Sequence, residues 1–123
     1  LSRVPHASNM LTGAHLEIPA FDENDHRALR KAEWMKESML KVARVQFLVQ
    51  EGERTMGQAA IQFVLAKPTI VSVLPNITSL DDLKEFTEAL NVPGLTQTDQ
   101  DYILELWHNG FDLNEEEKAF RDI

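Results

Sequence analysis

The sequence predicts an α/β chain that is mostly helical, with two short parallel strands that form only part of a sheet. Helical periodicity covers most of the chain after residue 25. The run 69–74 is short, β-branched and almost continuously apolar, as in a parallel strand covered on both faces. Such a strand needs a neighbour at each edge, and the chain offers only one other candidate. The predicted sheet is therefore incomplete.

Composition limits the classes of function. The 123 residues fit a single unit, 1–123, with one hydrophobic core. The net charge of −8 disfavours nucleic-acid binding, because an acidic surface repels phosphates. The sequence contains no cysteine, no apolar stretch long enough for a bilayer and no secretory signal, so we expect a cytoplasmic protein without membrane contact. The chain opens with Leu1 rather than Met, so we also expect a piece of a longer protein.

The first part of the chain predicts a strand end, a loop and a long helix. Residues 1–5 are interpreted as the strand, and 6–24 lack sustained periodicity and form a long loop, a class that is often functional. Apolar residues then recur at helical spacing over 25–50. Asn24 is the expected N-cap of this helix and Gly52 its C-terminal stop.

A second helix follows immediately. Thr55–Gln58 has the form of a capping box, and the helix that it opens runs to about Ala66, where Lys67–Pro68 stops it. Its residues are apolar on most sides, which predicts burial. Residues 25–66 are thus predicted to form two helices.

The last part of the chain predicts a strand followed by helices. The strand 69–74 ends at Pro75, and a helix over 79–90 begins with a serine cap. A further helix over 96–107 begins with a threonine cap and is stopped by an Asn-Gly pair. The whole of 79–123 is assigned to C-terminal helices.

Chemistry is expected where the second strand passes into its helix, from Val73 to Asp82. The free N–H groups of a helix N-terminus attract anions, and this one follows the carboxyl end of a strand. The loop Pro5–Asn9, after the other strand, is the expected companion. The alternative is an ordinary turn between strand and helix with a good N-cap, and the local pattern leaves both open.

Four segments in order resemble one family, the aldo-keto reductases. Arg3–Gly13 reads RVPHASNMLTG and resembles the family's seventh barrel strand, and Gly57–Ala66 is similar to its G-Q-A-A-L helix. Val71–Leu83 resembles the eighth strand and the cofactor loop after it, and Leu95–Thr96 resembles the opening of the last helix. The order and the gaps agree over nearly the whole chain.

The resemblance implies a C-terminal fragment of a (β/α)8 TIM barrel, from the seventh strand onward. The parent would be an NAD(P)-dependent oxidoreductase that transfers hydride between the nicotinamide cofactor and a small carbonyl or alcohol substrate. The family's catalytic Asp, Tyr, Lys and His come from earlier strands, so we expect no catalytic residue here and no activity of the chain alone. The only tyrosine, Tyr102, lies in a late helix and is not assigned to that set.

The same resemblance implies which residues contact the cofactor. The expected position beside the nicotinamide ring is Arg3. Those expected along the ribose and diphosphate are Val4, Pro5, His6 and Ser8. Those expected around the adenosine end are Asn76, Thr78, Ser79 and Asp82.

Departures from the family pattern bear on the choice of cofactor, NAD or NADP. Thr78 stands where a basic residue often meets the 2′-phosphate of NADP, and Asp81 and Asp82 add two carboxylates nearby. Because these carboxylates repel a dianionic phosphate, we expect a preference for NAD, or weak cofactor binding. His6 replaces a leucine, and contact of its ring with a phosphate is one interpretation.

Other readings of the residues are simpler. The four histidines show no i, i+4 pair and no metal-binding spacing, so we expect no metal site.

An alternative function is a non-catalytic helical module for interaction or oligomerisation, derived from such a barrel. Its exposed strand edges would then be covered by another copy of the chain. The sequence does not identify the substrate, because most specificity loops lie outside these residues.

Overall fold

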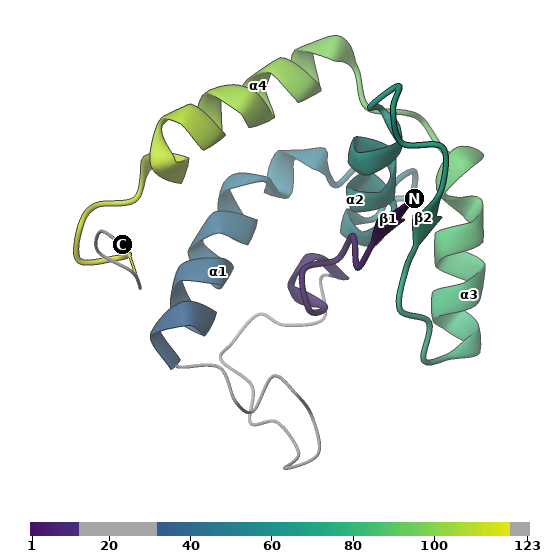
Figure 1. Ribbon diagram of the computed structural model, residues 1–123, viewed down its shortest axis with the longest axis horizontal. Coiled ribbons are helices and arrows are strands. Elements are labelled where there is room, and N and C mark those ends of the chain that lie inside the picture. Colours follow the sequence, from purple (N-terminus) through teal and green to yellow (C-terminus); the bar gives the residue numbers. More distant parts are fainter. Residues whose placement is uncertain (13–31, 119–123) are drawn as a thin grey trace.

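The computed structural model describes residues 1–12 and 32–118, except for the side chains of Ala32 and Glu33. Figure 1 shows the arrangement of the elements. In chain order they are the strand β1 (Ser2–Arg3), the 3-10 turn η1 (Met10–Thr12), the helix α1 (Ala32–Arg44), the 3-10 turn η3 (Gln46–Leu48), the helix α2 (Met56–Leu65), the strand β2 (Val73–Leu74), the helix α3 (Leu80–Thr87), the 3-10 turn η4 (Glu88–Leu90), the helix α4 (Gln97–His108) and the 3-10 turn η5 (Gly110–Asp112).

Helix α2 is the central element, between α1 on one side and α3 on the other (Figure 1). The predicted capping box is confirmed. The Thr55 hydroxyl accepts a hydrogen bond from the backbone N–H of Gln58, whose side chain accepts one from the backbone N–H of Thr55. The predicted burial is also confirmed, because every residue from Met56 to Gln62 is buried. A helix that is apolar on most sides is stable in water only when other elements cover it.

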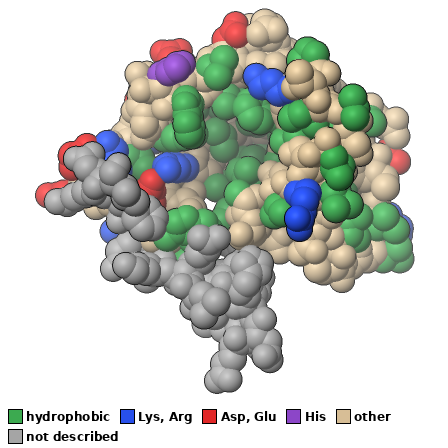
Figure 2. All heavy atoms as spheres, in the orientation of Figure 1, with side chains coloured by type: hydrophobic (Ala, Val, Ile, Leu, Met, Phe, Trp, Pro, Cys, Tyr) green, Lys and Arg blue, Asp and Glu red, His purple; other side chains and the backbone are tan. Residues whose placement is uncertain are grey.

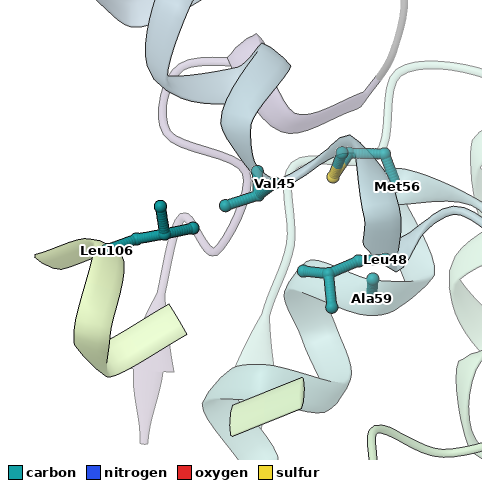
Figure 3. Packing of buried hydrophobic residues seen from close by; sticks show 5 residues of the cluster. All are labelled: Val45, Leu48, Met56, Ala59 and Leu106. Atoms are coloured by element: carbon teal, nitrogen blue, oxygen red, sulfur yellow. The ribbon is translucent and has the colours of Figure 1, made fainter. Parts of the chain in front are cut away.

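Two apolar clusters hold the helices together. The first joins the end of α1, the turn η3, α2 and α4, and Figure 3 shows its members Val45, Leu48, Met56, Ala59 and Leu106. The second joins α2 to α3 and η4 through Ile61, Phe86 and Ala89. Since α2 contributes to both clusters, its packing connects the two halves of the described structure.

A buried arginine adds a polar connection between distant segments. Arg54 is only 2% exposed, and its Nε donates to the carbonyl oxygen of Leu48 at 2.9 Å. Its Nη1 donates to the carbonyl oxygen of Pro93 at 2.9 Å, and its Nη2 lies 3.9 Å from the carboxylate of Asp99. The two carbonyl contacts are the stronger ones, because 3.9 Å is beyond hydrogen-bonding distance.

The two strands pair in parallel, with Ser2 opposite Val73 and Arg3 opposite Leu74. The predicted strand 69–74 is wrong in length and in burial. Only Val73–Leu74 is a strand, Val71 is 86% exposed and Leu74 is 56% exposed. The physical reason is that the described residues offer β2 a single two-residue neighbour. The first strand, predicted over 1–5, is likewise limited to Ser2–Arg3.

The long helix predicted over 25–50 is shorter at its C-terminal end. Helix α1 ends at Arg44, and η3 follows as a 3-10 turn. Gly52 does not stop a helix. It lies, with φ +76°, in a tight turn closed by the bridge between Gln50 and Arg54, a backbone conformation that glycine adopts at low cost. The predicted Asn24 cap and most of the predicted loop 6–24 lie outside the described residues.

The predicted starts of the last two helices are confirmed. Ser79 caps α3, and Thr96 caps α4 with a full capping box that includes Asp99. Of the region predicted as C-terminal helices, 113–118 contain only a turn and 119–123 lie outside the described residues. Over the residues that the structure describes, none of the helices combines the length and the apolar character needed to cross a bilayer.

Candidate cofactor site

The loops that follow β1 and β2 leave the sheet at the same edge, because the two strands run parallel (Figure 1). The pairing continues one residue past β1, where the backbone N–H of Val4 donates to the carbonyl oxygen of Leu74 at 3.1 Å. The structure therefore brings together the two segments predicted to contact a cofactor, although they lie about 70 residues apart in the sequence.

The loop after β1 follows an unusual backbone path. Val4, Ala7, Ser8 and Asn9 all have positive φ, between 48° and 67°. This conformation is uncommon for residues other than glycine and unfavourable for a β-branched residue such as Val4. Residues held in such conformations persist only when surrounding contacts fix them, and they cluster at functional sites.

The predicted residues at the end of β1 and in this loop differ in accessibility. Arg3 and Val4 are exposed and Ser8 is half-buried, whereas Pro5 and His6 are buried. His6 is 2% exposed, and its Nε2 lies 2.9 Å from the carbonyl oxygen of Gly57 in α2. Its ring therefore faces the helices rather than solvent. The interpretation of His6 as a phosphate contact is not supported by this geometry, because packing already encloses the ring.

The loop after β2 presents exposed polar residues, Asn76, Thr78 and Ser79. The carboxylate of Asp82 accepts hydrogen bonds from the backbone N–H of Thr78 at 3.0 Å and from its hydroxyl at 2.9 Å. The backbone N–H of Asp82 in turn donates to the hydroxyl oxygen of Ser79 at 3.0 Å. The backbone hydrogen bond from Thr78 is the largest cause that holds the pKa of Asp82 below its ordinary value. The protein's own carboxylate thus occupies donors at the start of α3.

Sequence reasoning missed the role of Gly57. A Cβ built at Gly57 would lie 2.9 Å from the ring of Phe86 and 2.9 Å from Oε1 of Glu85, both on α3. The absence of a side chain therefore allows α3 to approach α2 closely. The hydroxyl of Thr55 also donates to Oε1 of Glu85 at 2.5 Å, which reinforces the same contact. The only sequence signal was a glycine in the first turn of a buried helix, where glycine is a poor helix former.

An apolar cavity of about 340 Å³ lies between α1, α2, α4 and the turns η1 and η5, and its wall also includes Ala7 of the loop after β1. Figure 2 shows hydrophobic side chains gathered around the hollow on this face. Its walls include Met10, Val42, Phe63, Ile103, Trp107 and Phe111. None of the residues predicted to contact a cofactor lines this cavity. Within 1–12 and 32–118, no group of three or more potential metal ligands is present.

The fold and the site define a class of protein. Two parallel strands, with polar loops at their shared carboxyl edge and a helix after β2, are characteristic of α/β proteins that bind ligands at that edge. The model of the aldo/keto reductase family matches residues 2–108, which is most of the chain, and the chain belongs to this family. Searches among curated proteins and among solved structures returned no match. Membership implies a TIM-barrel parent, an oxidoreductase function in general and use of NAD(P)H.

Proposed function

We propose that this chain is the C-terminal portion of an aldo/keto reductase, from the seventh barrel strand onward. Its parent transfers hydride between NAD(P)H and a small carbonyl or alcohol substrate, and this segment contributes cofactor loops without the catalytic set. The observation that supports the proposal is the parallel pairing of β1 with β2, which brings both predicted cofactor segments to one edge. A cytoplasmic location is part of the same proposal.

The exposed residues at this edge suit a dinucleotide. Arg3 offers a cation, and Asn76 and Ser79 offer polar groups in a loop after a parallel strand, whereas both donors of Thr78 are bound to Asp82. When bound, the nicotinamide supplies the carbon that carries hydride. The chain's own residues would bind and orient the ribose, diphosphate and adenosine parts, with Arg3 and Ser8 on the β1 side and the β2 loop on the adenosine side.

The contacts of Asp82 support NAD over NADP. The carboxylate already accepts both donors of Thr78, the residue that stands where family members often have a basic side chain. A 2′-phosphate would have to displace a carboxylate and then remain close to it, and like charges at short range repel. NAD carries a 2′-hydroxyl in place of this phosphate, so it meets no such repulsion.

Titration of the chain and of a longer chain that includes the earlier barrel strands, with NADH and with NADPH, tests the proposal. We expect tighter binding of NADH than of NADPH, because the 2′-hydroxyl of NADH avoids the like-charge contact that a 2′-phosphate would make with the carboxylate of Asp82. Asp82→Asn should narrow the ratio of the NADH affinity to the NADPH affinity, because NADPH should bind more tightly once the carboxylate is removed. Asp101→Asn, on α4, removes an exposed carboxylate outside the predicted site and should leave the ratio unchanged. A strong NADPH preference in the unmodified protein would overturn the assignment.

The absence of the family's catalytic positions gives a separate test. We expect the 123-residue chain to show no carbonyl reduction in the presence of either cofactor. The longer chain should show turnover. Turnover by the short chain would mean that a catalytic residue lies within it.

A second candidate function is a helical interaction or oligomerisation module. Leu1 is 74% exposed, Val71 is 86% exposed and Leu74 is 56% exposed, all in or beside the two-stranded sheet. Exposed apolar residues at an open strand edge favour association with a further copy of the chain. Sedimentation of the chain decides between the candidates. A stable oligomer that Leu74→Lys dissociates, without any cofactor binding, would favour the module.

A further inference from the structure

The side chain of His6 joins the loop after β1 to the helices α2 and α3. It belongs to the loop after β1, and its Nε2 lies 2.9 Å from the carbonyl oxygen of Gly57 in α2. Its ring stacks on Phe86, with centroids 4.4 Å apart and planes inclined by 28°. Phe86 belongs to α3, the helix that begins directly after the β2 loop. One buried ring therefore contacts the helix between the two loops and the helix that follows the second loop.

The contacts also determine which nitrogen carries the proton. A carbonyl oxygen only accepts hydrogen bonds, so Nε2 must be the donor in its contact with Gly57. The other nitrogen, Nδ1, is buried and has no hydrogen-bond partner among the described residues. A proton on Nδ1 would be a buried donor without an acceptor, which is unfavourable. The geometry thus selects the neutral ring with hydrogen on Nε2.

We infer that His6 is a positioning residue for the cofactor loop after β1. That loop has positive φ at Ala7, Ser8 and Asn9, directly beyond the anchored ring. The backbone of His6 also takes part, because its carbonyl oxygen accepts from the N–H of Leu11 at 3.0 Å. Anchoring the ring on α2 and α3 fixes the residue directly before Ala7, Ser8 and Asn9, the three consecutive residues with positive φ. The cofactor part of this inference rests on the proposed function, whereas the packing part does not.

Two substitutions separate the two contacts of the ring. His6→Phe keeps the stacking on Phe86 and removes the donor to Gly57. His6→Gln keeps an N–H donor, because Nε2 of glutamine lies as many bonds from the backbone as Nε2 of histidine. It removes the aromatic ring. His108→Gln, at the exposed end of α4, is the matched control, since it changes a histidine outside the site.

Amide hydrogen exchange of the unliganded chain is the first measurement. We expect the Leu11 amide to exchange about fivefold faster in His6→Phe, because this variant loses one buried hydrogen bond. His6→Gln should recover part of the protection of this amide against exchange. The amide of Leu106 in α4 serves as the reference, because global unfolding would accelerate it equally. Ring-nitrogen NMR should show hydrogen on Nε2 and a bare Nδ1 in the unmodified chain.

A ring with hydrogen on Nδ1, or equal acceleration at Leu11 and Leu106 in His6→Phe, would overturn the inference. Titration with NADH then separates it from the proposed function. If the unmodified protein binds NADH, His6→Phe should weaken binding by about fivefold, and unchanged binding would count against a positioning role. If the unmodified protein does not bind NADH, the proposed function fails, while the exchange and NMR results still decide whether His6 anchors the loop.

Discussion

Asp82 accepts two hydrogen bonds from Thr78, one from the backbone N–H at 3.0 Å and one from the hydroxyl at 2.9 Å. The two residues lie on either side of the cap residue Ser79, so the start of α3 is stabilised by its own side chains. The same contact bears on local stability and on which anions can approach the β2 loop. It therefore leads to a prediction about pH.

The pKa of Asp82 lies below its ordinary value of 3.8, chiefly because the backbone N–H of Thr78 donates to the carboxylate. A lowered pKa in the folded state means that ionised Asp82 stabilises the fold above 3.8, and that this contribution is lost as the pH falls through the lowered pKa. We expect the NMR signal of the Thr78 amide to be constant near neutral pH and to shift only below that ordinary value. Asp82→Asn should abolish this shift. A Thr78 amide that titrates above 3.8 would contradict the assignment.

Gly57→Ala tests the close approach of α2 and α3. The added methyl group would lie 2.9 Å from the ring of Phe86, which is packed against His6 and has little room to move. We expect a loss of about 1–3 kcal/mol in the free energy of unfolding from overpacking, partly offset by about 1 kcal/mol of better helix propensity. Urea denaturation measures the difference. Gly94→Ala, where nothing lies within 4 Å of the added Cβ, is the control and should leave stability nearly unchanged.

Arg54→Met tests the buried guanidinium. The substitution keeps an unbranched apolar side chain and removes the donors to the carbonyl oxygens of Leu48 and Pro93. We expect a loss of about 2 kcal/mol or more, since hydrogen bonds from charged groups contribute about 1.5–3 kcal/mol each. Arg44→Met, at the exposed end of α1, should have little effect. Arg54→Lys should rescue little, because an ammonium group does not reproduce the two separate donor directions of a guanidinium.

The two threonine caps should differ in strength. Thr96→Ala removes a capping hydrogen bond at the surface and should cost about 1 kcal/mol. Thr55→Ala removes the corresponding bond at α2 and also the hydrogen bond to Glu85 on α3. We therefore expect a larger loss of unfolding free energy for Thr55→Ala in chemical denaturation. Equal losses would mean that the contact with Glu85 contributes nothing measurable.

Much of the secondary structure was predictable because its signals are local. Thr55, Ser79 and Thr96 were all expected as N-caps, and each accepts a backbone N–H three residues later. Capping depends on residues within one helical turn, so the sequence window contains all the necessary partners. The end of α1 was not predictable in this way, since the apolar spacing continues past Arg44 into η3.

The candidate site was predicted in part. The two segments that contribute to it were predicted from their resemblance to the family, and the structure brings them to one sheet edge. The inward orientation of His6 was not predicted, because the acceptor on Gly57 lies 51 residues away. The burial of Arg54 was missed for the same reason, since one of its acceptors is 39 residues distant at Pro93.

The sequence by itself determined where most helices begin, the burial of an apolar α2 and membership in a family of oxidoreductases. These follow from short-range hydrogen bonding, apolar periodicity and the order of motifs. Tertiary structure alone decided that β2 is only two residues long and largely uncovered, that His6 anchors a loop, and that Asp82 occupies the donors of Thr78. The reason is physical: burial and hydrogen-bond partnership depend on which distant segments meet, and a local pattern does not contain that information.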